Sequence, residues 1–176
     1  MLRLLLLVIL LSPQLSLAQK PLRESPSREK PLVDIDLGFS TGNYNGATFS
    51  EVNLGVNLNF TDWLTWRNSG FKRFGSAQVK EITGLDSTLR LISTNHFDGG
   101  LFRLFGGAGY RFADDSNKNA LLGEGGVGLQ IDRFGLGAGV KYLKYDKTQY
   151  DSNRIETSNS EVIYFVALSG GARLIF

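Results

Sequence analysis

The sequence predicts an all-β fold: an eight-stranded antiparallel up-and-down transmembrane β-barrel. Three observations lead to this prediction. The chain ends with a long alternating run that closes on Phe176, it contains further segments in which apolar and polar residues alternate, and it begins like an exported protein. Because successive strand side chains point to opposite faces, such alternation indicates strands with one apolar and one polar face.

The terminal segment carries the strongest pattern. From Val162 to Phe176 every second residue lies on one largely apolar face, and the opposite face is mostly small or polar. A soluble domain has little use for a strand this long that ends on an aromatic residue. The segment resembles the last strand of bacterial outer-membrane barrels. That resemblance implies that Phe176, Leu174 and Ala172 form a signal read by the outer-membrane assembly machinery.

The amino terminus is typical of a secretory signal peptide. Arg3 supplies a positive charge, residues 4–11 are all Leu, Val or Ile, and Ser16 and Ala18 are the small residues that a signal peptidase inspects. We therefore expect a signal peptide at 1–18. All four Pro precede residue 32 and all 21 Gly follow it. This division predicts a flexible periplasmic leader at 19–31 and a barrel at 32–176.

Composition narrows the possible functions without naming one. The chain has no Cys, which excludes disulfides, thiol catalysis and Cys-based zinc sites. Its formal net charge of +2 argues against a nucleic-acid partner. The chain shows no phosphate-binding loop and no metal-ligand spacing, so we expect no cofactor.

The first half of the barrel region contains four predicted strands. Each shows apolar residues at every second position, and the ranges are about 33–40, 50–60, 64–74 and 85–93. The third is the least regular, because Asn68 and Gly70 interrupt the apolar face that begins with Leu64 and Trp66. A bulge near Ser69 and Gly70 would restore the alternation.

Four more strands complete the barrel region. Their predicted ranges are about 101–112, 121–131, 134–145 and 162 to the chain end. Glycines are frequent on their polar faces, which suits a crowded barrel interior. Eight strands of this length match tilted transmembrane strands of about 9–11 residues.

The connections between these strands alternate in kind. Those at Thr61–Trp63 and Asp132–Arg133 are tight. The longer, polar ones are Thr41–Phe49, Gly75–Gly84, Ala113–Asn119 and Asp146–Ser160. Counted from a periplasmic amino terminus, the long connections fall outside and the tight ones inside, as expected for outer-membrane barrels. The remaining inner connection, Thr94–Gly100, is longer than this rule favours.

The apolar face of the barrel is expected to contact lipid. A secreted barrel of the lipocalin type would instead turn that face inward around a ligand. The polar face here is too thin for a soluble exterior, since each strand carries only one or two charges with glycines between them. Aromatic residues near the ends of the apolar face resemble interfacial girdles. We therefore expect Val56, Leu104 and Val140 to face lipid near mid-membrane.

The polar face would then fill the bore. Its predicted charged residues are Asp34, Asp36, Glu51, Arg67, Arg90, Arg103, Arg111, Glu124, Lys141 and Arg173. Eight strands leave a bore that side chains can just fill, and charges buried there must be paired. We expect a structural plug in which cations outnumber carboxylates, and in which Glu51 and Glu124 each bond to a cation of this set other than Arg111. The alternative is a gate or a narrow ion path.

Catalysis has one candidate, His96, the only histidine. Known enzymes with eight-stranded barrels, the lipid A deacylases and palmitoyltransferases, resemble this chain in strand count. They use a His with a Ser and a carboxylate near the outer rim. His96 falls in a predicted inner connection and no Ser stands two residues after it, so we expect no enzyme.

From Leu32 to Phe176 the chain resembles the small eight-stranded bacterial outer-membrane proteins, the family that includes the transmembrane domain of outer-membrane protein A. The resemblance rests on the signal peptide, the eight amphipathic strands and Phe176. It implies contact with outer-membrane lipid and polar loops at the cell surface that serve membrane integrity, adhesion or binding of an unnamed extracellular ligand. The alternatives are a narrow porin-like pore and a lipid-modifying enzyme.

Overall fold

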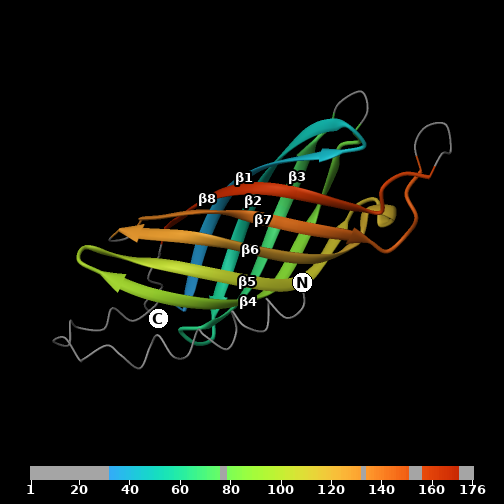
Figure 1. The fold of residues 1–176 in the computed structure, drawn as a ribbon. Coiled ribbons are helices and arrows are strands. Elements are labelled where there is room, and N and C mark those ends of the chain that lie inside the picture. Colours follow the sequence, from blue (N-terminus) through green and yellow to red (C-terminus); the bar gives the residue numbers. More distant parts are fainter. Residues whose placement is uncertain (1–31, 76–78, 132–133, 151–155, 171–176) are drawn as a thin grey trace, which may run out of the picture.

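The structure is a computed structural model that describes residues 32–75, 79–131, 134–150 and 156–170. These residues form one closed barrel of antiparallel strands in sequential order (Figure 1). The strands are β1 (Val33–Tyr44), β2 (Ala47–Asn59), β3 (Leu64–Phe74), β4 (Ile82–Phe97), β5 (Gly100–Ala113), β6 (Ala120–Ile131), β7 (Phe134–Tyr145) and β8 (Ser160–Gly170). A short 3-10 helix, η1 (Ser116–Lys118), lies between β5 and β6. The prediction of an eight-stranded up-and-down barrel is confirmed.

The barrel closes through pairing of the first and last strands. Each strand pairs with its successor, and β1 pairs with β8 from Ile35 opposite Gly170 to Asn43 opposite Val162. Closure leaves no strand with a free edge, so the backbone groups of each strand find partners on both sides. No helix in the described residues is long and apolar enough to cross a membrane.

The two ends of the barrel differ in their connections. We call the end that carries the β2–β3, β4–β5 and β6–β7 connections the turn end, and the opposite one the loop end. Figure 1 shows η1 and the β7–β8 connection at the loop end and the β4–β5 turn at the other. The strands have 11 to 16 residues, so most of them exceed the ~9–11 residues that cross a membrane.

The connection between β1 and β2 is shorter than predicted. Instead of a loop at 41–49, the two strands continue to a two-residue turn at Asn45 and Gly46, where φ is 50° and 82°. Positive φ at both central residues is the mark of a type I′ turn, and Asn-Gly is its preferred sequence. The side-chain oxygen of Asn43 also accepts a hydrogen bond from the Gly46 N–H at 3.0 Å.

The inner connection predicted at 94–100 is also wrong. Strand β4 runs to Phe97, and a two-residue turn at Asp98 and Gly99 leads directly into β5. Gly99 has a φ of 90°, which favours glycine. His96 therefore lies in β4, paired with Leu101, and its side chain is exposed. The β4–β5 connection is therefore a tight turn, as expected for this end of the barrel.

Strand β3 contains no bulge. Its pairing with β2 and β4 continues without a break through Ser69 and Gly70. Asn68 and Gly70 therefore remain on the outward face, and Asn68 pairs with Ser87 of β4. Ser87 in turn accepts a hydrogen bond from Trp66 Nε1 at 2.9 Å. The apolar pattern of β3 is therefore interrupted because its outward face carries polar residues at this level. The register of the strand does not change.

The inside and outside of the barrel are opposite in chemistry. Outward side chains are largely apolar and exposed, for example Val56 (42%), Leu104 (55%) and Val140 (44%). Inward positions hold asparagines, glycines and charged residues, and Asp86 and Arg111 are wholly buried. The predicted signal peptide, leader, Arg173 and the assembly signal at Ala172, Leu174 and Phe176 lie outside the described residues.

Candidate functional site

The interior of the barrel is layered along its axis. Nearest the loop end lies an apolar cluster, formed by Tyr44, Ala47, Phe49, Val79, Ala120, Leu122, Leu143, Tyr145 and Ile163. Below it, charged side chains from all eight strands meet in a buried network. A cavity occupies the part of the bore nearest the turn end. Because the inward positions repeat every second residue, each strand supplies one side chain to each successive level.

Arg111 of β5 lies at the centre of the network. Its Nε and Nη2 donate to the two oxygens of Asp86 at 2.7 and 2.9 Å. Its Nη1 and Nη2 donate to the two oxygens of Glu51 at 3.0 and 3.2 Å. The guanidinium also lies 3.9 Å from the ring centroid of Phe71. One arginine thus joins carboxylates of β2 and β4 in a bidentate manner.

Arg73 of β3 extends the network toward the loop end. It donates to Glu51 at 2.8 Å and to both oxygens of Glu161 on β8, one of them at 3.2 Å. Its guanidinium lies 3.7 Å from the ring centroid of Phe49. Arg73 therefore links strands on both sides of the β1–β8 closure. All three charged side chains are nearly inaccessible to solvent.

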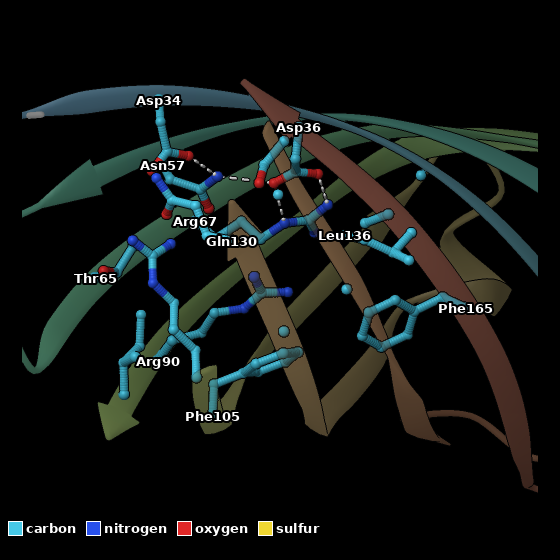
Figure 2. A pocket seen from close by; sticks show the side chains of 18 of the residues that line it. Asp34, Asp36, Asn57, Thr65, Arg67, Arg90, Phe105, Gln130, Leu136 and Phe165 are labelled. Atoms are coloured by element: carbon cyan, nitrogen blue, oxygen red, sulfur yellow. Dashed lines mark hydrogen bonds and ion pairs between the residues drawn. The ribbon is translucent and has the colours of Figure 1, made fainter. Parts of the chain in front are cut away.

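Three further ion pairs lie toward the turn end. Arg67 contacts Asp36 at 2.6 Å, Arg90 contacts Glu124 at 2.7 Å, and Lys141 contacts Asp86 at 2.8 Å, the last joining this level to the Arg111 group. These distances join side-chain nitrogen and oxygen atoms. Figure 2 shows Asp34, Asn57 and Asp36 along one side of the cavity, with Phe105 and Phe165 facing them.

The structure brings the predicted charged residues together. Those within the described residues all point inward: Asp34, Asp36, Glu51, Arg67, Arg90, Arg103, Arg111, Glu124 and Lys141. The prediction missed Arg73, Asp86 and Glu161. The bulge predicted near Ser69 and Gly70 interrupted the expected alternation before Arg73, so Arg73 was not assigned to the interior. Glu161 precedes the predicted start of the last strand. Asp86 already stood on the predicted polar face of its strand, so its signal was present.

Two expectations about this network need correction. Glu51 binds Arg73 and Arg111, and neither belongs to the cations expected to hold it. Glu124 binds Arg90, as expected. In addition, cations do not outnumber carboxylates in the described interior, because Asp86 and Glu161 add two anions against the single cation Arg73. The network is therefore close to electrically neutral.

The connections at the loop end cover the apolar cluster. Gln149 donates to the backbone oxygens of Asn117 and Lys147 at 2.6 and 2.8 Å, which ties the β7–β8 connection to η1. Lys118 of η1 reaches down so that its Nζ lies 4.2 Å from the ring centroid of Tyr44. Burial there lowers the pKa of Lys118, and Glu161 opposes this change only in part.

The charged groups of the described interior are engaged mainly with one another. The buried carboxylates accept from arginine or lysine, and no group of three or more His, Cys, Asp or Glu among the described residues could hold a metal ion. His96 is exposed and lies at the turn end, away from the network. The arrangement can hold strands together and fill space. The polar cavity is the part of the described interior that has room for a ligand.

Comparison with known proteins gives a likeness of fold only. No protein-family model and no curated protein matches the chain. A solved structure described as a de novo design of transmembrane β-barrels matches with a TM-score of 0.53 and 12% identity, covering 80% of this chain and 98% of that one. The crystal structure of Neisserial surface protein A matches with a TM-score of 0.49 and 10% identity, covering 78% and 94%.

The chain has the fold of an eight-stranded transmembrane barrel. At 12% identity the designed barrel supports the architecture and says nothing of activity. The fold alone does not determine the function.

Proposed function

We propose that the protein is a non-enzymatic integral barrel of the bacterial outer membrane, whose bore is closed by its own side chains and whose polar loops face the cell surface. The observation that carries this proposal is the inversion of inside and outside. Arg111 and Asp86 have no exposed surface, whereas Leu104 and Leu168 are more than half exposed. A water-soluble protein gains by burying its apolar side chains, so an apolar exterior of this extent is stable only against lipid.

Aromatic side chains support the membrane placement. At the turn end Phe60, Trp63 and Phe134 are strongly exposed, and at the loop end Phe112 and Tyr164 are. Such residues favour the boundary between hydrocarbon and water, where a ring can be partly wet. Two groups at opposite ends of the strands are typical of a barrel that spans one bilayer. In this placement the turn end lies in the periplasm and the loop end lies outside.

The closed bore is supported by two successive layers. The apolar cluster below η1 and the network around Arg111 both consist of side chains that are almost wholly buried. An ion would have to separate paired charges and then pass between packed rings. Each buried pair that breaks costs several kcal/mol, so steady conduction is disfavoured. The cavity at the turn end is therefore a blind pocket in this proposal.

Recordings in planar bilayers test the closed bore. We expect the purified, refolded barrel to give no steady single-channel conductance. A stable ohmic conductance in the unmodified protein would contradict the closed bore and favour the narrow pore. Mass spectrometry of lipid A from cells with and without the protein tests the enzymatic alternative. A mass change that depends on the protein would overturn the non-enzymatic assignment.

Epitope tags in the two tight turns test the orientation. A tag between Asn45 and Gly46 should be labelled by antibody on intact cells. A tag between Asp98 and Gly99 should be labelled only after the outer membrane is permeabilised. The two sites form a matched pair, because both are two-residue turns ending in a glycine with positive φ. The reverse pattern would overturn the orientation, and equal labelling would overturn membrane insertion.

A loop deletion separates surface interaction from membrane integrity. In one variant residues 114–119 are replaced by Asn-Gly, so that a four-residue connection joins Arg111 to Ala120, the last pair of the β5–β6 ladder. If the loops bind a partner, this variant should behave like a deletion strain in adhesion assays. If the barrel itself maintains the membrane, the variant should restore normal sensitivity to detergents. Restoration of neither property, with normal folded yield, would place the function elsewhere.

A further inference from the structure

The part of the bore nearest the turn end contains a cavity of about 100 Å³. Its lining begins with residues at the turn ends of the strands, including Asp34, Thr65, Arg103 and Ser169. It ends deeper in the barrel at Lys141. Asp34, Arg103 and Ser169 are only partly buried, so the cavity is reached from the turn end.

Glycine creates the space on one side of this cavity. Gly128 of β6 and Gly137 of β7 line it and contribute no side chain. A Cβ placed on Gly137 would meet only ordinary contacts, the nearest being the backbone oxygen of Val127 at 3.6 Å. The glycine at 137 is therefore not required by crowding. Its absence of a side chain leaves room that a larger residue would fill.

The cations around the cavity are not equally matched. Arg67 pairs with Asp36, Arg90 with Glu124 and Lys141 with Asp86, each at 2.8 Å or less. Arg103 makes no ion pair with any described residue. The carboxylate that would suit it, Asp34, instead accepts hydrogen bonds from Asn57 at 2.6 Å and Asn59 at 3.2 Å.

Two charged donors are left over at this cavity. Arg67 Nη1 and Arg103 Nε are buried, and neither has a hydrogen-bond partner among the described residues. Both residues line the cavity, and Arg67 as a whole is only 4% exposed. A buried donor on a guanidinium that finds no acceptor carries a large desolvation penalty. Asn57 Oδ1, a neutral acceptor that lines the same cavity, also has no partner among the described residues. Two charged donors around one space nevertheless indicate that an anionic acceptor fits there.

We propose that this cavity is a binding site for a small oxyanion, such as phosphate or a short carboxylate, that enters from the periplasmic side. Guanidinium groups present planar N–H donors that match carboxylate and phosphate oxygens. The ligand would accept from Arg103 and from the spare Nη1 of Arg67. Gly128 and Gly137, which follow Arg103 across the β5–β6–β7 ladder, provide its space. The site goes beyond the proposed function. Its access from the periplasm rests on the proposed orientation, but the site does not depend on the bore being closed or on the loops.

Titration calorimetry of the full mature chain in a phosphate-free maltoside detergent tests the site. Sodium phosphate is the probe, sodium acetate is titrated in parallel, and ionic strength is held constant. We expect saturable binding of one phosphate per barrel, and acetate tells whether a carboxylate also fits. Chloride is the decisive comparison, because an oxyanion site should prefer phosphate to chloride by at least tenfold. No saturable phosphate binding, or equal binding of chloride, would overturn the proposal.

Two variants and one control locate the binding. Arg103→Gln removes the unpaired cation, and Gly137→Leu fills the space while leaving every charge in place. Each should weaken phosphate binding at least tenfold. Lys72→Gln is the control, because Lys72 is an exposed cation that pairs with Glu81 outside the bore. Phosphate binding that survives both interior variants, or that is lost equally in the control, would contradict the site. The comparison of phosphate with chloride in the unmodified chain decides the question even if a variant fails to fold.

Discussion

Replacing Arg111 with Met should destabilise the barrel by about 3–5 kcal/mol. Met is close to arginine in length and keeps the contact with Phe71, but it removes the charge and all five donors. The buried carboxylates of Asp86 and Glu51 would then lose hydrogen bonds at 2.7–3.2 Å. Neither carboxylate can reach water, because both side chains are wholly inaccessible.

The magnitude follows from what remains after the change. Four hydrogen bonds to charged groups at roughly 1.5–3 kcal/mol each would give about 6–12 kcal/mol if they were lost outright. However, Asp86 keeps Lys141 at 2.8 Å and Glu51 keeps Arg73 at 2.7 Å. Each carboxylate therefore still has one cation, which lowers the loss to the range observed when one member of a buried pair is removed.

Urea unfolding in lipid vesicles measures this loss. Trp63, in the β2–β3 connection, and Trp66, on the outer face of β3, are the only tryptophans. Both are exposed, so their fluorescence reports on insertion. Arg103→Met is the matched control, because it removes an inward arginine that makes no ion pair with the described residues. We expect it to remain within about 1 kcal/mol of the unmodified protein. Equal losses in the two variants would refute the reasoning, since cost would then not depend on pairing.

Three further predictions concern assembly, the outer face and close packing. Deleting Phe176 should lower the amount of heat-modifiable folded barrel in outer-membrane fractions, and a normal yield would contradict its role as an assembly signal. Leu104→Arg should cost about 2–4 kcal/mol in bilayers, whereas no loss would mean that this face contacts water. Gly109→Ala should cost about 1–3 kcal/mol by overpacking, because its Cβ would press against the backbone oxygen of Ser87. Gly123→Ala is its control, since a Cβ there meets nothing within 4 Å, and similar urea midpoints for both would count against the packing argument.

Strand number and facing could be predicted because a bilayer demands alternation over its whole thickness. Nearly all of β7 lies within the bilayer, where alternation is required. Its predicted range, 134–145, therefore agrees with the observed strand, Phe134–Tyr145. The requirement ends where the strand leaves lipid. Outward residues of β1 beyond that point are polar, including Thr41 and Asn43, so the strand looks like a loop although its ladder continues to Tyr44.

The interior could be predicted as a set of residues but not as a set of pairs. Which carboxylate meets which cation depends on strand tilt and on the stagger between neighbouring strands, and neither is visible in a single sequence. Glu51 illustrates this: it bonds to Arg73 and Arg111, which come from β3 and β5 and not from one neighbouring strand. The sequence also could not show that Arg103 lacks an ion pair with the described residues. The nearby carboxylate of Asp34 instead accepts hydrogen bonds from two asparagines.

The pairing of β1 with β8 has a consequence for the order in which the molecule can form. The first strand made has no second neighbour until the last strand exists, so every intermediate carries two unpaired edges. Such edges pair readily with other chains, and contacts between the two ends of a sequence form slowly. The chain must therefore be kept from associating with other copies of itself until it reaches the membrane. A single cut between β7 and β8 should be tolerated once the barrel has closed, but the same cut made earlier should leave a seven-stranded sheet that cannot close.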